Sequence, residues 1–149
     1  MKASISPVSA DLSASTSPTD SACTLHVCTS CRLPTGHRSS ANRRPGSILF
    51  RELREAIAQS PMRDRVKVQP AECLSVCPRP CGIALTAADS WTYLFGDQVP
   101  TETTSDILKC LERYLDSPDG FLARLMRPKA LQKSILGRIP PSLGASACI

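Results

Sequence analysis

Hydrophobic and polar residues alternate in four short runs of the chain, which predicts four strands. Two of these runs, Thr24–Val27 and Val66–Val68, place an apolar side chain at every second position. The other two, Ile83–Leu85 and Trp91–Phe95, are rich in β-prone residues and are separated by the polar stretch 87–90. Two such runs around a polar turn are typical of a hairpin. We therefore predict two separate strands followed by a two-stranded hairpin.

Apolar residues recur at helical spacing in two other segments. The first set is Leu49, Leu53, Ala56 and Ile57, and the second is Ile107, Leu108, Leu111, Tyr114 and Leu115. We predict that the first helix starts after Pro45-Gly46 with Ser47 as its N-cap and ends at Ser60-Pro61. The second is predicted to start with a capping box formed by Thr103 and Asp106 and to end at Ser117-Pro118. One or two short helical turns are expected between residues 121 and 135.

The predicted order is β-α-β, then a β-hairpin, then a C-terminal helix. This order gives an α/β fold with a thioredoxin-like arrangement, in which a crossover joins two parallel strands. We expect a single domain at 23–141. Residues 1–22 are dominated by Ser, Thr, Ala and Pro, so we expect a disordered N-terminal tail there, and a flexible tail at 142–149.

Composition narrows the functional classes. The chain has 149 residues, a net charge of +5 and only 4% aromatic residues. No apolar run approaches the roughly 20 residues of a membrane span, and no export signal is visible, so a cytoplasmic protein with reduced thiols is expected. Basic residues do not interleave with aromatic ones, which argues against nucleic-acid binding. They crowd instead around residues 32–44 and the C-terminal third. Such clusters are often solvated faces, and they also suit docking of an acidic redox partner protein at this basic rim or control of the field at an anionic metal centre.

Five of the eight cysteines fall in two groups that each follow a predicted strand. Cys28-Thr-Ser-Cys31 follows the first strand, and Cys73-Leu-Ser-Val-Cys77 follows the second, with Cys81 shortly after it. Because parallel strands end side by side, the topology predicts that both groups meet at one edge of the sheet. Thiols grouped in this way indicate metal or redox chemistry.

Three chemistries suit two cysteine pairs. Zinc takes four thiolates, although zinc ribbons usually separate their pairs by only about 15–20 residues. A dithiol redox centre at Cys28 and Cys31 would need a helix N-terminus beside the first thiol, and it leaves Cys73 and Cys77 unexplained. The third possibility is a [2Fe-2S] cluster held by four thiolates.

The chain resembles the thioredoxin-like [2Fe-2S] ferredoxins. The resemblance lies in Leu25-His26-Val27-Cys28 with a second cysteine close by, in Gly46-Ser47 opening a helix, in Cys73-Leu-Ser-Val-Cys77, and in an aromatic strand before a closing helix. It implies four ligands, Cys28, Cys31, Cys73 and Cys77, and a non-enzymatic role in one-electron transfer or redox sensing.

A closer resemblance is to a group of small, uncharacterised bacterial proteins described as predicted metal-binding. It is carried by Glu72-Cys-Leu-Ser-Val-Cys-Pro-Arg-Pro-Cys81, Trp91-Thr-Tyr-Leu-Phe-Gly-Asp97, Ser117-Pro-Asp-Gly120 and Arg138-Ile-Pro-Pro141. The chain departs from the ferredoxins in its C-x2-C first pair and in Cys81, a possible fifth metal ligand. Zinc binding or metal trafficking through the same cysteines, and a C-x2-C thiol oxidoreductase, remain the alternatives.

Charged and polar residues near the cysteines have simpler expected roles. Arg32 and Arg79 lie beside proposed ligands, where positive charge would raise the potential of a cluster. His26 is expected to be packed or hydrogen-bonded, and Cys110 to fill the core. We do not expect the other cysteines and histidine to be metal ligands. These are Cys23 at the edge of the disordered tail, His37 in a loop and Cys148 near the end of the chain.

Overall fold

The structure is a computed structural model that describes residues 22–32 and 40–142. The strands are β1 (Cys23–Cys28), β2 (Val66–Ala71), β3 (Ile83–Thr86), β4 (Thr92–Phe95) and β5 (Ile135–Ile139). The helices are α1 (Pro45–Ala58), α2 (Thr104–Asp116) and the short α3 (Lys129–Lys133), with 3-10 turns η1 (Ala41–Arg43) and η2 (Arg124–Met126). Most of the predicted tails, at 1–21 and 143–149, and His37 and Cys148 lie outside the described residues.

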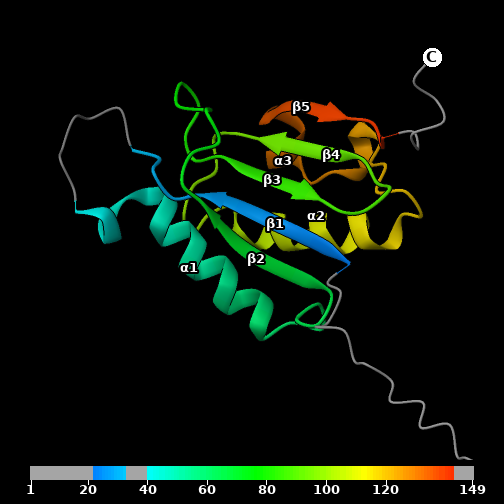
Figure 1. Cartoon of the computed structure of the whole chain (residues 1–149), viewed down its shortest axis with the longest axis horizontal. Coiled ribbons are helices and arrows are strands. Elements are labelled where there is room, and N and C mark those ends of the chain that lie inside the picture. Colours follow the sequence, from blue (N-terminus) through cyan, green and yellow to red (C-terminus); the bar gives the residue numbers. More distant parts are fainter. Residues whose placement is uncertain (1–21, 33–39, 143–149) are drawn as a thin grey trace, which may run out of the picture.

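The strands form one mixed sheet in the order β2-β1-β3-β4-β5 (Figure 1). β1 pairs with β2 in parallel, whereas β3, β4 and β5 join as successive antiparallel neighbours. The predicted thioredoxin-like β-α-β unit and hairpin are therefore confirmed.

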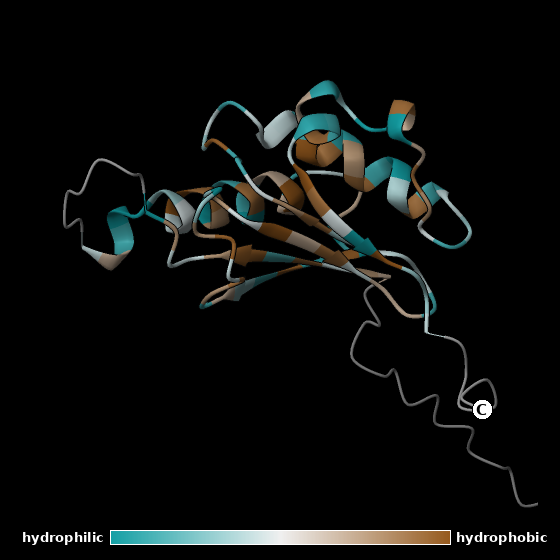
Figure 2. Ribbon diagram, turned by 90° about the horizontal axis from the view of Figure 1, so that it is seen from above, coloured by the Kyte–Doolittle hydropathy of each residue, from teal (hydrophilic) through white to brown (hydrophobic). Residues whose placement is uncertain are grey.

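Helices α1 and α2 contact each other and cover one face of the sheet (Figure 2). The strand side chains under them are fully buried, and they pack against the apolar stripes of both helices. The largest buried members of this core are Leu25, Leu49, Leu53, Ile83, Leu85, Tyr93, Phe95, Ile107 and Leu111. Burial of this apolar surface is the main force that holds the helices against the sheet.

Residues on the opposite face of the sheet are only partly buried. His26 lies on this face, and its Nε2 is 2.9 Å from the hydroxyl oxygen of Thr86 on the neighbouring strand β3. Burial lowers the pKa of His26, and the charge of Lys67 lowers it further. His26 is thus a hydrogen-bonded strand residue, as expected from the sequence.

The predicted N-cap of α1 is wrong, whereas Thr103 is the N-cap residue of α2 as predicted but forms no capping box. α1 begins at Pro45, which fits the first turn because its missing N–H needs no partner there. The Ser47 hydroxyl donates to the carbonyls of Ala41 and Thr29 instead. At α2 no side chain caps the helix, because the Thr103 hydroxyl bonds to the backbone of Val99 rather than to the helix.

Strand β5 is absent from the prediction. It pairs with β4 with an irregular register at Leu94 and Phe95, and it contains Gly137, a poor strand residue. Its last three residues are exposed, so the alternation that identified the other strands does not appear. Within the described residues, no helix is long and apolar enough to cross a bilayer.

Tyr93 ties the sheet to the segment after α2, which gives a test of the fold. Its buried hydroxyl oxygen accepts a 2.7 Å hydrogen bond from the backbone N–H of Leu122. Tyr93→Phe leaves that donor unsatisfied, so we expect the free energy of unfolding to fall by about 1–3 kcal/mol. Urea denaturation measures this change, and a midpoint equal to that of the unsubstituted protein would contradict the assigned hydrogen bond.

Candidate metal centre

Five cysteines gather where β1 and β2 end. Cys28 is the last residue of β1 and lies opposite Ala71, the last residue of β2. Cys31 lies three residues after Cys28. Cys73 and Cys77 lie in the loop that leaves β2, and Cys81 ends that loop just before β3. We call these five residues the cysteine rim.

Backbone hydrogen bonds join the two cysteine-bearing loops. The N–H of Thr29 donates to the carbonyl of Ala71 at 2.8 Å, and the N–H of Cys28 donates to the carbonyl of Gly82 at 2.9 Å. The Ser30 hydroxyl donates to the carbonyl of Glu72. The loop after β1 is therefore held to both ends of the 72–82 segment, although some 40 residues separate them in sequence.

The thiols themselves interact across these loops. Cys31 is close enough to Cys28 and to Cys81, and Cys73 to Cys77, for neighbouring thiols to shift one another's pKa. The charges of Cys31 and Cys28 also raise the pKa of Cys77. Cys28 and Cys31 are thus the centre of the rim, with Cys73 and Cys77 on one side and Cys81 next to Cys31.

Backbone N–H groups point at two of the sulfurs. The Sγ of Cys31 accepts from Gly82 N at 3.4 Å, and the Sγ of Cys73 accepts from Ser75 N at 3.3 Å. The backbone of Leu74, which lies between Cys73 and Cys77, is close enough to Cys28 to lower its pKa, against the larger raising effect of burial.

The thiol pKa values follow from burial and crowding. Burial raises the pKa of Cys28. The hydrogen bond between Cys31 and Cys81, followed by burial, raises the pKa of Cys31, and the same bond lowers the pKa of Cys81. For exposed Cys77 the charge of Cys73 is the main cause that raises the pKa. Neighbouring thiolates repel one another, and a bound cation would relieve that repulsion.

The donor set suits a thiolate-bound metal, although no ligand set is preformed. Cys28, Cys31 and Cys81 are buried, while Cys73 and Cys77 are exposed. Among the residues that the structure describes, no three Cys, His, Asp or Glu side chains are arranged to hold a metal ion. Four thiolates could surround a metal here only if exposed side chains rotate toward the buried pair.

Glycines allow the rim to pack tightly against its supports. Gly46 opens α1, and a Cβ on it would lie 2.0 Å from the carbonyl oxygen of Cys28 and 3.3 Å from the Cβ of Cys31. A Cβ on Gly82 would lie 2.3 Å from a methyl group of Val76, the buried residue before Cys77. The sequence analysis did not predict these two contacts. The only signal for them in the sequence is that one glycine follows a cysteine and the other lies at a helix start.

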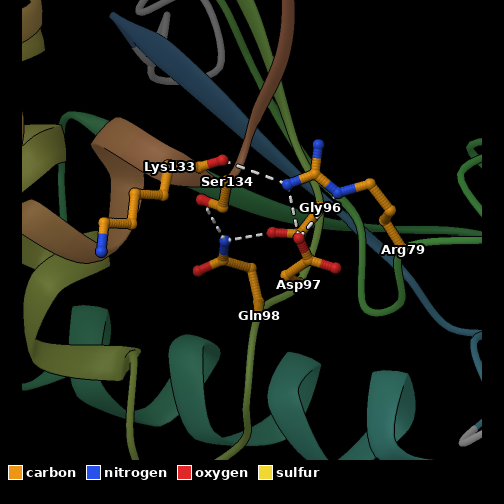
Figure 3. A network of polar contacts seen from close by, with 6 residues as sticks. All are labelled: Arg79, Gly96, Asp97, Gln98, Lys133 and Ser134. Atoms are coloured by element: carbon orange, nitrogen blue, oxygen red, sulfur yellow. Dashed lines mark hydrogen bonds and ion pairs between the residues drawn. The ribbon is translucent and has the colours of Figure 1, made fainter.

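Polar contacts hold the second half of the 72–82 loop to the rest of the domain (Figure 3). The guanidinium of Arg79 pairs with the carboxylate of Asp97 at 2.5 Å and donates to the carbonyl of Lys133 at 3.1 Å. The buried Gln98 amide donates to the carbonyl of Gly96 and to the hydroxyl of Ser134. Main-chain bonds between Cys81 and Gln98 continue this connection.

The pairing of Arg79 with Asp97 was not foreseen. We expected positive charge at Arg79 to favour reduction of a cluster, and in the structure that charge is paired with Asp97. The pair contributes a net charge near zero and positions the loop. Arg32, which is exposed one residue after Cys31, keeps the expected position beside the rim.

A basic hollow of about 420 Å³ borders the rim. It is lined by Thr29, Asn42, Ser47, Phe50, Arg51, Arg54 and Pro70. Thr29 lies between Cys28 and Cys31, so the hollow begins at the rim itself and continues along α1. Together with exposed Arg32 and Arg43, it gives this side of the molecule a positive surface.

Two further cysteines lie apart from the rim. Cys23 was placed at the edge of a disordered tail, but it is the buried first residue of β1. Burial raises its pKa to about 12. Cys110 is buried in α2, as predicted, and burial likewise raises its pKa to about 12. Thiols with such pKa values are inert at neutral pH.

Comparisons with known proteins agree with this fold. A family model described as "Protein of unknown function (DUF1636)" matches residues 25–141. A solved thioredoxin-like [2Fe-2S] ferredoxin from Aquifex aeolicus is similar at 16% identity, with a TM-score of 0.55, 83% of this chain covered and 98% of the ferredoxin. A wild-type structure of such a ferredoxin from that organism gives a TM-score of 0.51 at 16% identity, covering 78% of this chain and 98% of that one. No curated protein matches the chain.

Gly46→Ala tests the contact between α1 and the first cysteine pair. Because its methyl group would overlap the Cys28 carbonyl, we expect the metal-free protein to lose about 1–3 kcal/mol of stability. We also expect it to retain less than half of the metal bound by the unsubstituted protein. Gly137→Ala is the matched control, since nothing lies within 4 Å of its added Cβ. Equal stability and metal content in the two variants would contradict the assigned contact.

Proposed function

The chain belongs to the DUF1636 family, which is described as of unknown function, and we propose that its cysteine rim holds a [2Fe-2S] cluster for one-electron transfer or redox sensing. The observation that carries this proposal is the pair of backbone hydrogen bonds from Thr29 to Ala71 and from Cys28 to Gly82. They hold the loop of Cys28 and Cys31 against both ends of the segment that contains Cys73 and Cys77. The likeness to the Aquifex aeolicus ferredoxin structures supports the proposal at the level of fold.

The ligands that we propose are Cys28, Cys31, Cys73 and Cys77. Such a cluster, when bound, supplies a one-electron couple whose potential depends on charge and on hydrogen bonds to its sulfurs. This chain contributes the backbone N–H groups of Ser75 and Gly82, which donate to the sulfurs of Cys73 and Cys31. Donors of this kind stabilise negative charge on sulfur and favour the reduced state.

The surroundings of the loop limit its movement. The Arg79–Asp97 pair and the main-chain bonds between Cys81 and Gln98 hold its second half to β4. A loop held in this way changes little between oxidation states, which suits rapid electron transfer. We therefore propose an electron carrier rather than an enzyme.

The partner that we propose is an acidic redox protein. It would dock over the basic hollow beside the rim, where Arg51 and Arg54 lie next to Phe50. Arginine beside an aromatic ring is common at protein interfaces, and opposite charge speeds association. We propose no nucleic-acid or membrane partner, and a cytoplasmic setting would keep these thiols reduced.

A second candidate function is zinc binding or metal trafficking. It is favoured by the contact between Cys31 and Cys81, both buried, with Cys28 beside them. Among the described residues these thiols are not arranged around an ion. Their side chains would have to rotate for the three buried thiols to hold one, with Cys77 as the fourth ligand and Cys73 left free. The zinc site and the [2Fe-2S] cluster would both lie at the cysteine rim, and they differ in which four cysteines serve as ligands.

A thiol oxidoreductase is less well supported. A nucleophilic thiol needs a lowered pKa, whereas the pKa values of both Cys28 and Cys31 are raised. Both thiols precede α1 in sequence, although the start of that helix packs against them at Gly46.

Serine substitutions test the proposed ligands. After anaerobic purification we expect Cys28→Ser, Cys31→Ser, Cys73→Ser and Cys77→Ser each to lose most of the bound iron and acid-labile sulfide, because serine is a poor ligand for such a cluster. Cys110→Ala removes a buried thiol outside the rim and should keep the iron content of the unsubstituted protein. Full iron content in any two of the four serine variants would overturn the assignment.

Cys81→Ser separates the two candidate functions. If the cluster uses the four proposed ligands, this variant keeps its iron and sulfide, and its reduction potential shifts because Cys31 loses a hydrogen-bond partner. The zinc candidate predicts the opposite pattern, with metal lost in Cys81→Ser and kept in Cys73→Ser. Metal analysis of both variants, prepared side by side, gives the answer.

A further inference from the structure

A second concave site lies along β5, at the opposite edge of the sheet from β2. It has a volume of about 440 Å³ and is formed by β5 and the segment that contains η2. The residues that shape it are Phe121, Arg124, Arg127, Ile135, Leu136 and Arg138, and we call it the arginine pocket.

The arginine pocket has positive charge without a counter-charge. Three of its lining residues are arginines, and none is acidic. Within residues 22–32 and 40–142, none of these three arginines forms a salt bridge. Arg124 and Arg138 are close enough to Arg127 for their charges to lower its pKa, in addition to the larger effect of its burial.

Arg127 is the unusual member of this group. Its side chain is only 7% exposed, and its Nε and Nη1 atoms have no hydrogen-bond partner. A buried charge without partners is costly, and folded proteins normally pair it. No acidic side chain in the described part of the chain supplies that pairing, and an anion in the pocket would do so.

Arg138 is held in position by aromatic rings. Its guanidinium carbon lies 5.1 Å from the ring centroids of both Trp91 and Phe121, which pack edge to face. Such cation–π contacts restrict the side chain before any ligand binds. A pre-positioned guanidinium loses less conformational entropy on binding, and its fork suits carboxylate or phosphate oxygens.

We propose that the arginine pocket binds the oxyanion group, a phosphate or a carboxylate, of a small molecule. The pocket size is within the usual range for small-molecule sites, and Phe121, Ile135 and Leu136 offer apolar contacts to the body of such a ligand. This site is separate from the cysteine rim and does not depend on the metal that the rim holds.

The test titrates the full-length protein with inorganic pyrophosphate and, separately, with citrate, by calorimetry at constant ionic strength. We expect the unsubstituted protein to bind at least one of these anions. Arg124→Gln and Arg138→Gln should each weaken binding about tenfold or more, because each removes a charge-assisted hydrogen bond. Arg124 is exposed, so its variant should fold even if a change at buried Arg127 prevented folding.

Arg63→Gln is the control. Arg63 is also exposed, and it lines neither the arginine pocket nor the basic hollow beside the rim. If this variant binds the anion as the unsubstituted protein does while the pocket variants do not, the proposal holds. Absence of binding to both anions, or an equal loss in all three variants, would overturn it.

Discussion

The parallel pairing of β1 with β2 is the constraint on which the rest of the structure depends. Because the two strands run in the same direction, both cysteine-bearing loops leave the sheet at the same end. The bonds from Thr29 to Ala71 and from Cys28 to Gly82 then hold the loops in contact. Helix α1 connects the two strands, and its first turn lies against this end of the sheet. Only a glycine at position 46 allows that turn to pack so closely against Cys28.

Much of this architecture could be predicted from alternation and helical spacing. The four strands and two long helices depend on apolar residues that face one core, so their pattern is visible in the sequence. β5 was missed because its pairing with β4 is a tertiary contact, and its residues 137–139 are exposed. The start of α1 and the capping box of α2 were misjudged because the hydroxyls of Ser47 and Thr103 bond to other backbone groups.

The meeting of the cysteines was predictable from topology, but their individual environments were not. Sequence alone could not show that Cys31 bonds to Cys81 or that Cys73 and Cys77 are exposed. It also could not show that Arg79 is paired with Asp97, 18 residues later. The same limit applies to the arginine pocket, whose three guanidinium groups come from the η2 segment and from β5.

The two edges of the sheet therefore carry different chemistry on one scaffold. The β1–β2 end gathers the five cysteines of the rim and the basic hollow, while the β5 edge gathers three guanidinium groups that form no salt bridge within the described residues. The most direct test of the central claim is chemical analysis of the full-length protein, purified without oxygen and examined by visible absorption. The cysteine rim, if it holds the proposed cluster, yields a coloured protein with about two iron and two acid-labile sulfide ions per chain. A colourless protein that carries zinc, or no metal after reconstitution with iron and sulfide, would contradict it.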